Sequence, residues 1–209
     1  MPARAELKER AKTIFRANYG NSVLSFLIVS LLVGFVSYTL FGTILLAFPL
    51  ELGLICFYLM MYSGGFPDLS VLFTAGFTIN YARKIGGMAW MILWIFLWSL
   101  LFIIPGIIKA YSYAMTPYIL AAYPDVKAKD ALKLSMRIMN GHKGELFVLE
   151  LSFLGWQLLS LLTCGILEIL YVGPYMNLTM VAYEYELTDY AVRSGVISGA
   201  ELLGAQPVV

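Results

Sequence analysis

Three long apolar runs constrain this chain more than any other feature. They cover residues 21–62, 85–123 and 146–185. A transmembrane helix needs about 17–25 predominantly apolar residues, so each run is too long for one span and is interpreted as a hairpin of two. Turn signals lie inside each run, near residues 41–49, at Pro105 and Gly106, and between Gly165 and Pro174. The sequence therefore predicts an all-α polytopic membrane protein with six transmembrane helices.

The composition agrees with this interpretation. Hydrophobic residues make up 60% of the chain and charged residues 13%, whereas a soluble domain carries about 25% charged residues. The first apolar run, in which Val23 is the first apolar residue, follows an amphipathic segment, which is not the pattern of a cleavable signal peptide. We expect a single membrane domain over residues 1–209, with residues 188–209 as a cytoplasmic tail.

The basic residues predict the orientation of the spans. If six helices alternate across the membrane, every lysine and arginine except Lys109 falls on one side. Lysine and arginine concentrate in cytoplasmic loops, so both termini are expected in the cytoplasm. Lys109, near the start of the fourth span, is the exception to this pattern.

A threefold repeat is also expected. Each hairpin follows a segment that opens with proline and closes at asparagine, over residues 2–18, 67–80 and 124–140. Each returning span opens at or near a proline, namely Pro49, Pro105 and Pro174. Proline is tolerated in the first turn of a helix, and asparagine tolerates the left-handed conformation that ends one. The predicted units, residues 2–62, 67–123 and 124–187, each hold a cytoplasmic interfacial helix and a hairpin. The alternative is a chance recurrence of common helix punctuation.

The segments before the first and third hairpins are basic and amphipathic. Apolar positions recur at helical spacing at Leu7, Ala11, Ile14 and Phe15, and again at Ala128, Leu132, Ser135, Met136 and Met139. Such helices lie in the headgroup plane and favour anionic lipid. The candidate inner-leaflet contacts for lipid or a protein partner are Lys127, Lys129, Lys133, Arg137, His142 and Lys143. Alternatively, these helices only cover the cytoplasmic ends of the bundle.

Ionisable residues inside the spans are the second group of candidates, because they are costly in a bilayer and commonly functional. A predicted polar cluster in the outer half of the bundle contains Lys109, Glu51, Glu168 and Asn177. It could bind an ion, a solute or a lipid headgroup. Alternatively, Lys109 pairs with Glu51 or Glu168, or extends its ammonium to the outer interface. Glu150 lies deeper and is expected to contact His142, Lys143 or a tyrosine hydroxyl.

Two further patterns concern the third and fourth spans. Trp90, Trp94 and Trp98 recur every four residues and should line one face of the third span as a packing or lipid-facing ridge. Pro117 should kink the fourth span, because proline removes a backbone donor from the helix.

Enzymatic and metal-binding motifs are absent from the sequence. It contains no P-loop, no G-x-G-x-x-G, no H-E-x-x-H and no G-x-S-x-G. One histidine and two dispersed cysteines do not make a zinc or haem pattern. The basic residues are spread over membrane-proximal segments, which gives no support for nucleic-acid binding. We therefore expect no cofactor, no metal and no catalytic residues.

Three segments carry a resemblance to a known family: IIPGIIKAYSYAMTPYILA, ALKLSMRIMNGHKGELFVLELSFLGW and GPYMNLTMVAYEYEL. They resemble an uncharacterised family of bacterial integral membrane proteins, a domain of unknown function. That family is distantly similar to the membrane domain of some glycerophosphodiester phosphodiesterases. The resemblance implies a six-helix bundle in the bacterial cytoplasmic membrane and places Lys109 and His142 inside its motifs. It implies no activity, substrate or catalytic residue.

Two functions are expected from these observations. The first is a non-enzymatic membrane module that associates with lipid, anionic lipid included, or docks a protein partner through its cytoplasmic helices. The alternative is a small transporter or channel for an ion, a solute or a lipid that uses the polar cluster. The sequence leaves the oligomeric state open.

Overall fold

The computed structural model describes residues 3–36, 42–78 and 80–202, and its regular elements in these ranges are helices. The α-helices are α1 (Arg4–Ala17), α2 (Tyr19–Val36), α4 (Phe48–Tyr62), α5 (Val71–Phe77), α6 (Tyr81–Leu101), α7 (Ile103–Tyr113), α8 (Thr116–Ala122), α9 (Ala128–Ile138), α10 (Lys143–Leu151), α11 (Leu154–Leu162) and α12 (Gly173–Arg193). Two π-helical turns, η1 (Thr43–Ala47) and η2 (Glu168–Val172), and a 3₁₀ turn, η3 (Gly199–Leu202), complete the fold. The predicted all-α class is confirmed.

Three helical segments of the described ranges are long and apolar enough to cross a membrane. They are Tyr19–Val36, Ile44–Tyr62 and Lys143–Leu162. These segments correspond to the first, second and fifth predicted spans. The positions of the other three predicted spans are occupied by α6, by α7 with α8, and by α12.

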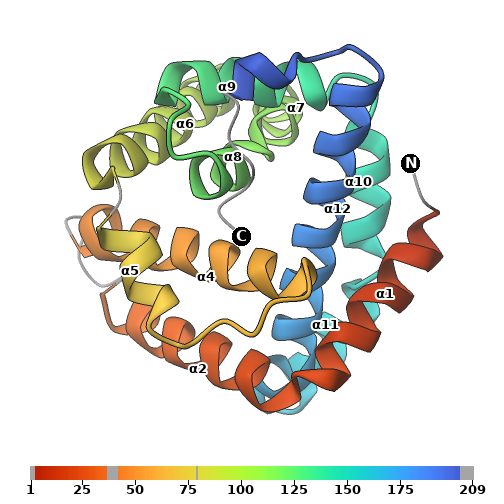
Figure 1. The fold of residues 1–209 in the computed structure, drawn as a ribbon. Coiled ribbons are helices and arrows are strands. Elements are labelled where there is room, and N and C mark those ends of the chain that lie inside the picture. Colours follow the sequence, from red (N-terminus) through yellow and green to blue (C-terminus); the bar gives the residue numbers. More distant parts are fainter. Residues whose placement is uncertain (1–2, 37–41, 79, 203–209) are drawn as a thin grey trace.

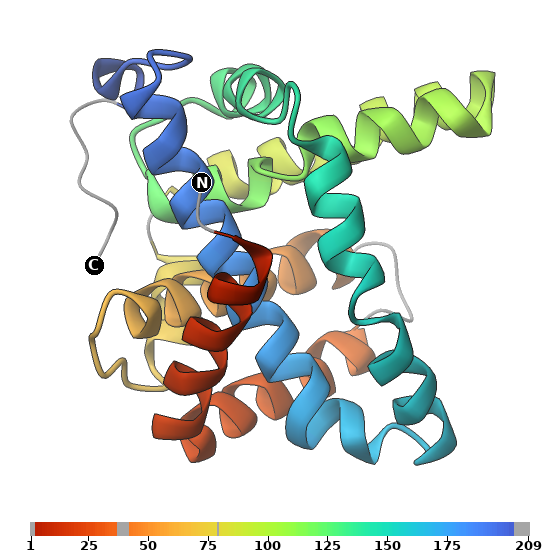
Figure 2. The ribbon, with the colours of Figure 1, turned by 90° about the vertical axis from the view of Figure 1, so that its right-hand side faces the viewer.

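In the described ranges, the turns of the second and third hairpins and the end of α2 lie toward one side of the molecule. In Figure 2, the α6–α7 turn, the turn between α11 and η2, and the C-terminal end of α2 all lie toward the right-hand side. The α6–α7 hairpin projects farthest, and the apolar side chains at its turn are exposed, with Phe102 at 69% and Ile103 at 75% of their full accessibility.

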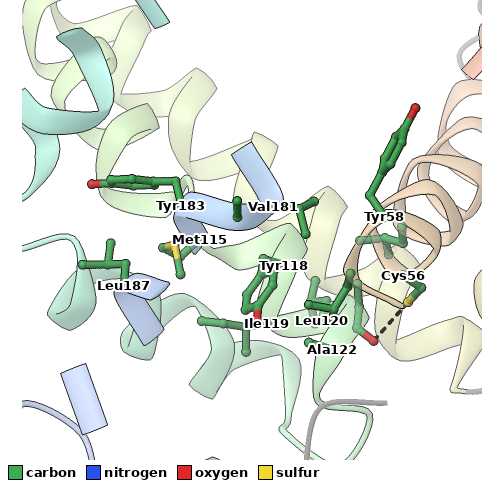
Figure 3. Packing of buried hydrophobic residues seen from close by; sticks show 14 of the residues in the cluster. Cys56, Tyr58, Met115, Tyr118, Ile119, Leu120, Ala122, Val181, Tyr183 and Leu187 are labelled. Atoms are coloured by element: carbon green, nitrogen blue, oxygen red, sulfur yellow. Dashed lines mark hydrogen bonds between the residues drawn. The ribbon is translucent and has the colours of Figure 1, made fainter. Parts of the chain in front are cut away.

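The core is built around α4, which crosses the middle of the view in Figure 1. Nearly all of its side chains are buried, since α2, α5, α8 and α12 pack around it. Figure 3 shows the junction with α8, where the Cys56 thiol donates to the backbone carbonyl of Ala121 at 3.4 Å. The α12 side chains Val181 and Tyr183 belong to the same buried cluster.

The two basic amphipathic segments fold as predicted, but their apolar faces pack on protein. On α1, Leu7, Ala11 and Phe15 are buried, and the Phe15 ring contacts Tyr171 and Tyr175 near the start of α12. On α9, the buried face lies against α6, α7 and α8, with the residues Ala131, Leu132, Leu134, Ser135 and Ile138. The polar faces of both helices stay outward.

The segment 67–80, expected to hold an interfacial helix, contains the short helix α5, which lies directly along α4. A Cβ atom at Gly53 would overlap the backbone carbonyl of Leu72, and one at Gly76 would overlap the carbonyl of Pro49. The two helix backbones can approach this closely only because both positions are glycine.

The predicted pattern of prolines at helix starts and asparagines at helix ends is partly present. Pro49 and Pro174 lie in the first turn of α4 and α12, each just after a π-helical turn, and Pro105 is the third residue of α7. Of the three asparagines, Asn80 adopts the left-handed conformation (φ 52°), whereas Gly141 takes it at the end of the third segment. Pro117 does not kink a continuous helix: α7 ends at Tyr113 and α8 starts with this proline in its first turn.

Candidate functional site

A groove of about 380 Å³ between α2, α4, α8 and α12 combines several polar groups with predicted spans. Its polar lining consists of Ser30, Glu51, Asn177 and Glu184. Its apolar lining consists of Phe26, Val29, Val33, Leu54, Ile55, Pro117, Met180 and Val181. Two of the four predicted cluster residues, Glu51 and Asn177, therefore share one groove.

The two carboxylates of this groove have no basic neighbour within ion-pair distance among the described residues. Glu51, the second residue after Pro49 in α4, is exposed and lines the groove. Glu184, four residues after Met180 in α12, is half-buried and lines it too. The Asn177 amide donates to the backbone carbonyl of Gly173 at 2.9 Å. The groove thus presents two acidic groups within apolar walls, an arrangement suited to a cationic group.

Lys109 lies outside this groove. Its Nζ atom is 5.1 Å from the centre of the Trp98 ring and 5.9 Å from that of Tyr113, and in the described part of the chain no carboxylate lies within 4.0 Å of it. Glu168, at the start of η2, does not line the groove either. The structure therefore separates the predicted cluster, and Lys109 contacts aromatic rings.

Of the partners predicted for Glu150, the structure shows a tyrosine hydroxyl, whereas His142 contacts Glu145 and Tyr190 instead. The Tyr111 hydroxyl donates to Glu150 Oε2 at 2.5 Å, which links α7 to α10. His142 Nδ1 lies 3.1 Å from Glu145 Oε2, and its ring packs edge-on against Tyr190. Lys143 is half-buried as the first residue of α10.

The remaining predicted contacts project from the outer face of α9. Lys127, Lys129, Lys133 and Arg137 are all exposed. Lys129 lies 5.9 Å from the centre of the Trp90 ring, Lys133 pairs with Asp130 at 3.5 Å, and Arg137 pairs with Glu201 at 2.5 Å. Lysines thus contact the tryptophan ridge of α6 at both ends, Lys129 at Trp90 and Lys109 at Trp98.

Two basic side chains at the start of α6 make structural contacts that the sequence does not predict. Arg83 donates to the backbone carbonyls of Leu120, Tyr123 and Val126, where α8 ends. Lys84 is 2% exposed and donates to the carbonyl of Ala75 in α5. Cations bind the unpaired carbonyls of helix ends favourably. From the sequence, both residues are interpreted only as loop charges, because no local pattern indicates that these carbonyls face them.

Within the described residues, no group of three or more His, Cys, Asp or Glu side chains could hold a metal ion. The groove carboxylates could hold a monovalent cation or an ammonium group, and the α9 cations could hold an anion. These are the two kinds of chemistry that the arrangement offers.

Comparison with known proteins gives one match. A family model described as "Protein of unknown function (DUF975)" matches residues 38–190, more than half of the chain. No curated protein and no solved structure matches. The predicted membership of an uncharacterised family is confirmed. The distant similarity to phosphodiesterase membrane domains and the bacterial origin stay predictions.

Proposed function

We propose that this chain, which belongs to the DUF975 family of proteins of unknown function, is a non-enzymatic integral membrane module that binds anionic lipid or a protein partner at the cytoplasmic membrane surface. The distribution of exposed side chains carries the proposal. Large apolar side chains are exposed along α2, α6, α7, α10 and α11, including Phe35 at 83% and Leu162 at 81%. Large apolar side chains exposed on this many helices support contact with a membrane.

Six transmembrane helices are part of this proposal. Support comes from the hairpin turns, which lie on one side of the molecule in Figure 2. The exposed apolar residues of α6 and α7 continue to the tip of their hairpin, with Leu100 and Ile104 both more than two thirds exposed. A water-soluble protein would bury such a tip, whereas a bilayer solvates it.

The threefold repeat is also proposed. Helices α1, α5 and α9 each precede a hairpin, and a proline lies in or near the first turn of α4, α7 and α12. The first and third units share a further feature, the π-helical turn that directly precedes the returning helix. The second unit lacks it, since α7 begins directly after Phe102.

The cytoplasmic surface is where we place the binding function. Because the apolar faces of α1 and α9 are covered by protein, only their basic faces are available to lipid or to a partner. Each lysine or arginine near an anionic membrane surface adds attraction of about 1 kcal/mol. Positive loop charge also orients this side toward the cytoplasm of a bacterial cell.

A charge reversal tests the proposal. The purified protein in detergent is titrated with short-chain phosphatidylglycerol, and the triple variant Lys127→Glu, Lys129→Glu, Lys133→Glu should lose most of this binding. The Lys109→Met variant is the matched control and should bind as the wild type does. If the triple variant binds anionic lipid normally and also retains every co-purifying protein, the docking function is wrong.

The groove between α2, α4 and α12 favours a second candidate, a small transporter or channel for a cationic solute. Charged residues inside membrane proteins commonly mark ion or substrate pathways, and Glu51 and Glu184 share one groove without a basic partner in the described residues. Proton or potassium flux into proteoliposomes should then be lost in the double variant Glu51→Gln, Glu184→Gln. A wild-type protein without flux removes this candidate.

A further inference from the structure

The basic face of α9 lines a cleft of about 470 Å³, to which the turn of residues 195–202 contributes Glu201. Three cations line it, Lys127, Lys133 and Arg137. Two carboxylates line it as well, Asp130 and Glu201, the first of which pairs with Lys133 on the same helix. Glu201 differs from Asp130 because it comes from a different element, η3.

The C-terminal segment reaches the cleft by folding back after α12. Gly195 adopts a left-handed conformation (φ 73°), and the backbone N–H of Ile197 donates to the carbonyl of Ala191. Ile197 and Leu202 are buried, at 1% and 5% exposure. Two apolar anchors therefore hold a short turn that places Glu201 over α9.

Glu201 is bound there in the way that a phosphate oxygen would be bound. Its Oε1 atom accepts from Arg137 Nη1 at 2.5 Å, and its Oε2 atom accepts from the backbone N–H of Ser198 at 2.7 Å. Arg137 also donates to the carbonyl of Val196. A guanidinium with neighbouring lysines is a preferred receptor for phosphate groups, and here a carboxylate of the same chain occupies it.

We infer that the α9 cleft is a phosphate-binding site that Glu201 occupies as an internal competitor, so that binding a phosphate group displaces the C-terminal turn. The ligand is the phosphate of an anionic phospholipid headgroup or a soluble phosphate. This inference rests on the proposed function, since it identifies the site of anionic-lipid binding and a means of controlling it. Removing Glu201 leaves Asp130 as the remaining carboxylate of the cleft lining, while all three cations stay.

The experiment removes the negative charge of Glu201 and keeps the size of its side chain. Glu201→Gln is purified in detergent and titrated with short-chain phosphatidylglycerol, with inorganic phosphate and with short-chain phosphatidylcholine as the zwitterionic control. Phosphatidylglycerol should bind to Glu201→Gln roughly fivefold to tenfold more tightly than to the wild type, because a group with the same charge as the ligand has been removed from the site. Asp189→Asn, which removes an acidic group paired with Arg193 away from the cleft, should bind as the wild type does.

A second variant separates a specific site from a general change in charge. Adding Arg137→Gln to Glu201→Gln should cancel the gain, because the guanidinium is then missing. A gain for inorganic phosphate alone would assign the site to a soluble phosphate. Equal binding by Glu201→Gln and the wild type in both arms overturns the inference. The proposed function fails separately, when reversal of Lys127, Lys129 and Lys133 leaves phosphatidylglycerol binding unchanged.

Discussion

The surroundings of Lys109 decide whether this residue makes a structural contact or belongs to a binding site. The residue lies between the rings of Trp98 and Tyr113, and the groove with Glu51 is built from other helices. A lysine over an aromatic ring gains about 0.5–1 kcal/mol at exposed sites. This interaction accounts for the position of the ammonium without requiring a carboxylate partner.

A double-mutant cycle tests that assignment. Lys109→Met should lower the free energy of unfolding by less than ~1 kcal/mol, and Glu51→Gln should act independently of it. Because distant sites add within about 0.5 kcal/mol, the double variant should equal the sum of the two single variants. Denaturant unfolding in detergent measures all four proteins. A coupling well above that value would restore the predicted Lys109–Glu51 pair.

At the scale of elements, the contact between α4 and α5 depends on glycine. Gly53→Ala should lower the free energy of unfolding by about 1–3 kcal/mol, because overpacking of this kind forces a shift and the new methyl group meets the Leu72 backbone. Gly86→Ala in α6 is the control: nothing lies within 4 Å of the added Cβ. Alanine there should raise stability by up to ~1 kcal/mol. Thermal unfolding in detergent measures the stability of both variants. An equal change in stability for Gly53→Ala and Gly86→Ala would contradict the close packing.

The C-terminal turn should respond to pH. The hydrogen bond from Arg137, together with the Ser198 N–H, lowers the pKa of Glu201 in the folded protein. A carboxyl with a depressed pKa stabilises the folded state above its ordinary pKa, about 4.3, and this contribution is lost as the pH falls through the lower, folded value. The protection of the backbone amides in residues 197–202, measured as their exchange rate relative to the intrinsic rate at the same pH, should therefore be high at neutral pH and fall below about pH 4. In Arg137→Gln, this protection should already be low at neutral pH; high protection there would show that the ion pair does not hold the turn.

The sequence predicted elements better than it predicted which elements meet. Periodicity identified the buried faces of α1 and α9 correctly, since burial follows helical spacing. The depth of Glu150 along its span correctly predicted a tyrosine hydroxyl among its possible partners. The groove was only half predicted: Glu51 and Asn177 came from repeat register, but Glu184 joins them through the way α12 crosses α2 and α4. The roles of Arg83 and Lys84 depend on carbonyls from other helices, which no local pattern encodes.

At the scale of the whole molecule, exposed apolar residues at the hairpin turns lie apart from the exposed cations of α9. The α6–α7 and α11–η2 turns, on one side in Figure 2, carry exposed apolar residues such as Ile104 and Ile166. The exposed cations of α9 lie away from those turns, on the segment between the second and third hairpins. This separation is what a membrane protein requires if one end inserts and the other faces the cytoplasm.

Cysteine labelling distinguishes six crossings from the three that length and apolarity alone support. Cys164 is exposed in the turn after α11, whereas Cys56 is buried and should stay unlabelled. In whole cells, a membrane-impermeant maleimide should label Cys164 and, in a Cys164→Ser background, Phe102→Cys at the α6–α7 turn. Ser70→Cys and Ser194→Cys, both exposed, should react only after the membrane is opened, because positive loops stay inside. If Phe102→Cys reacts from the same side as Ser70→Cys, α6 and α7 do not cross the membrane. If Ser194→Cys reacts from the same side as Cys164, then α12 does not cross it.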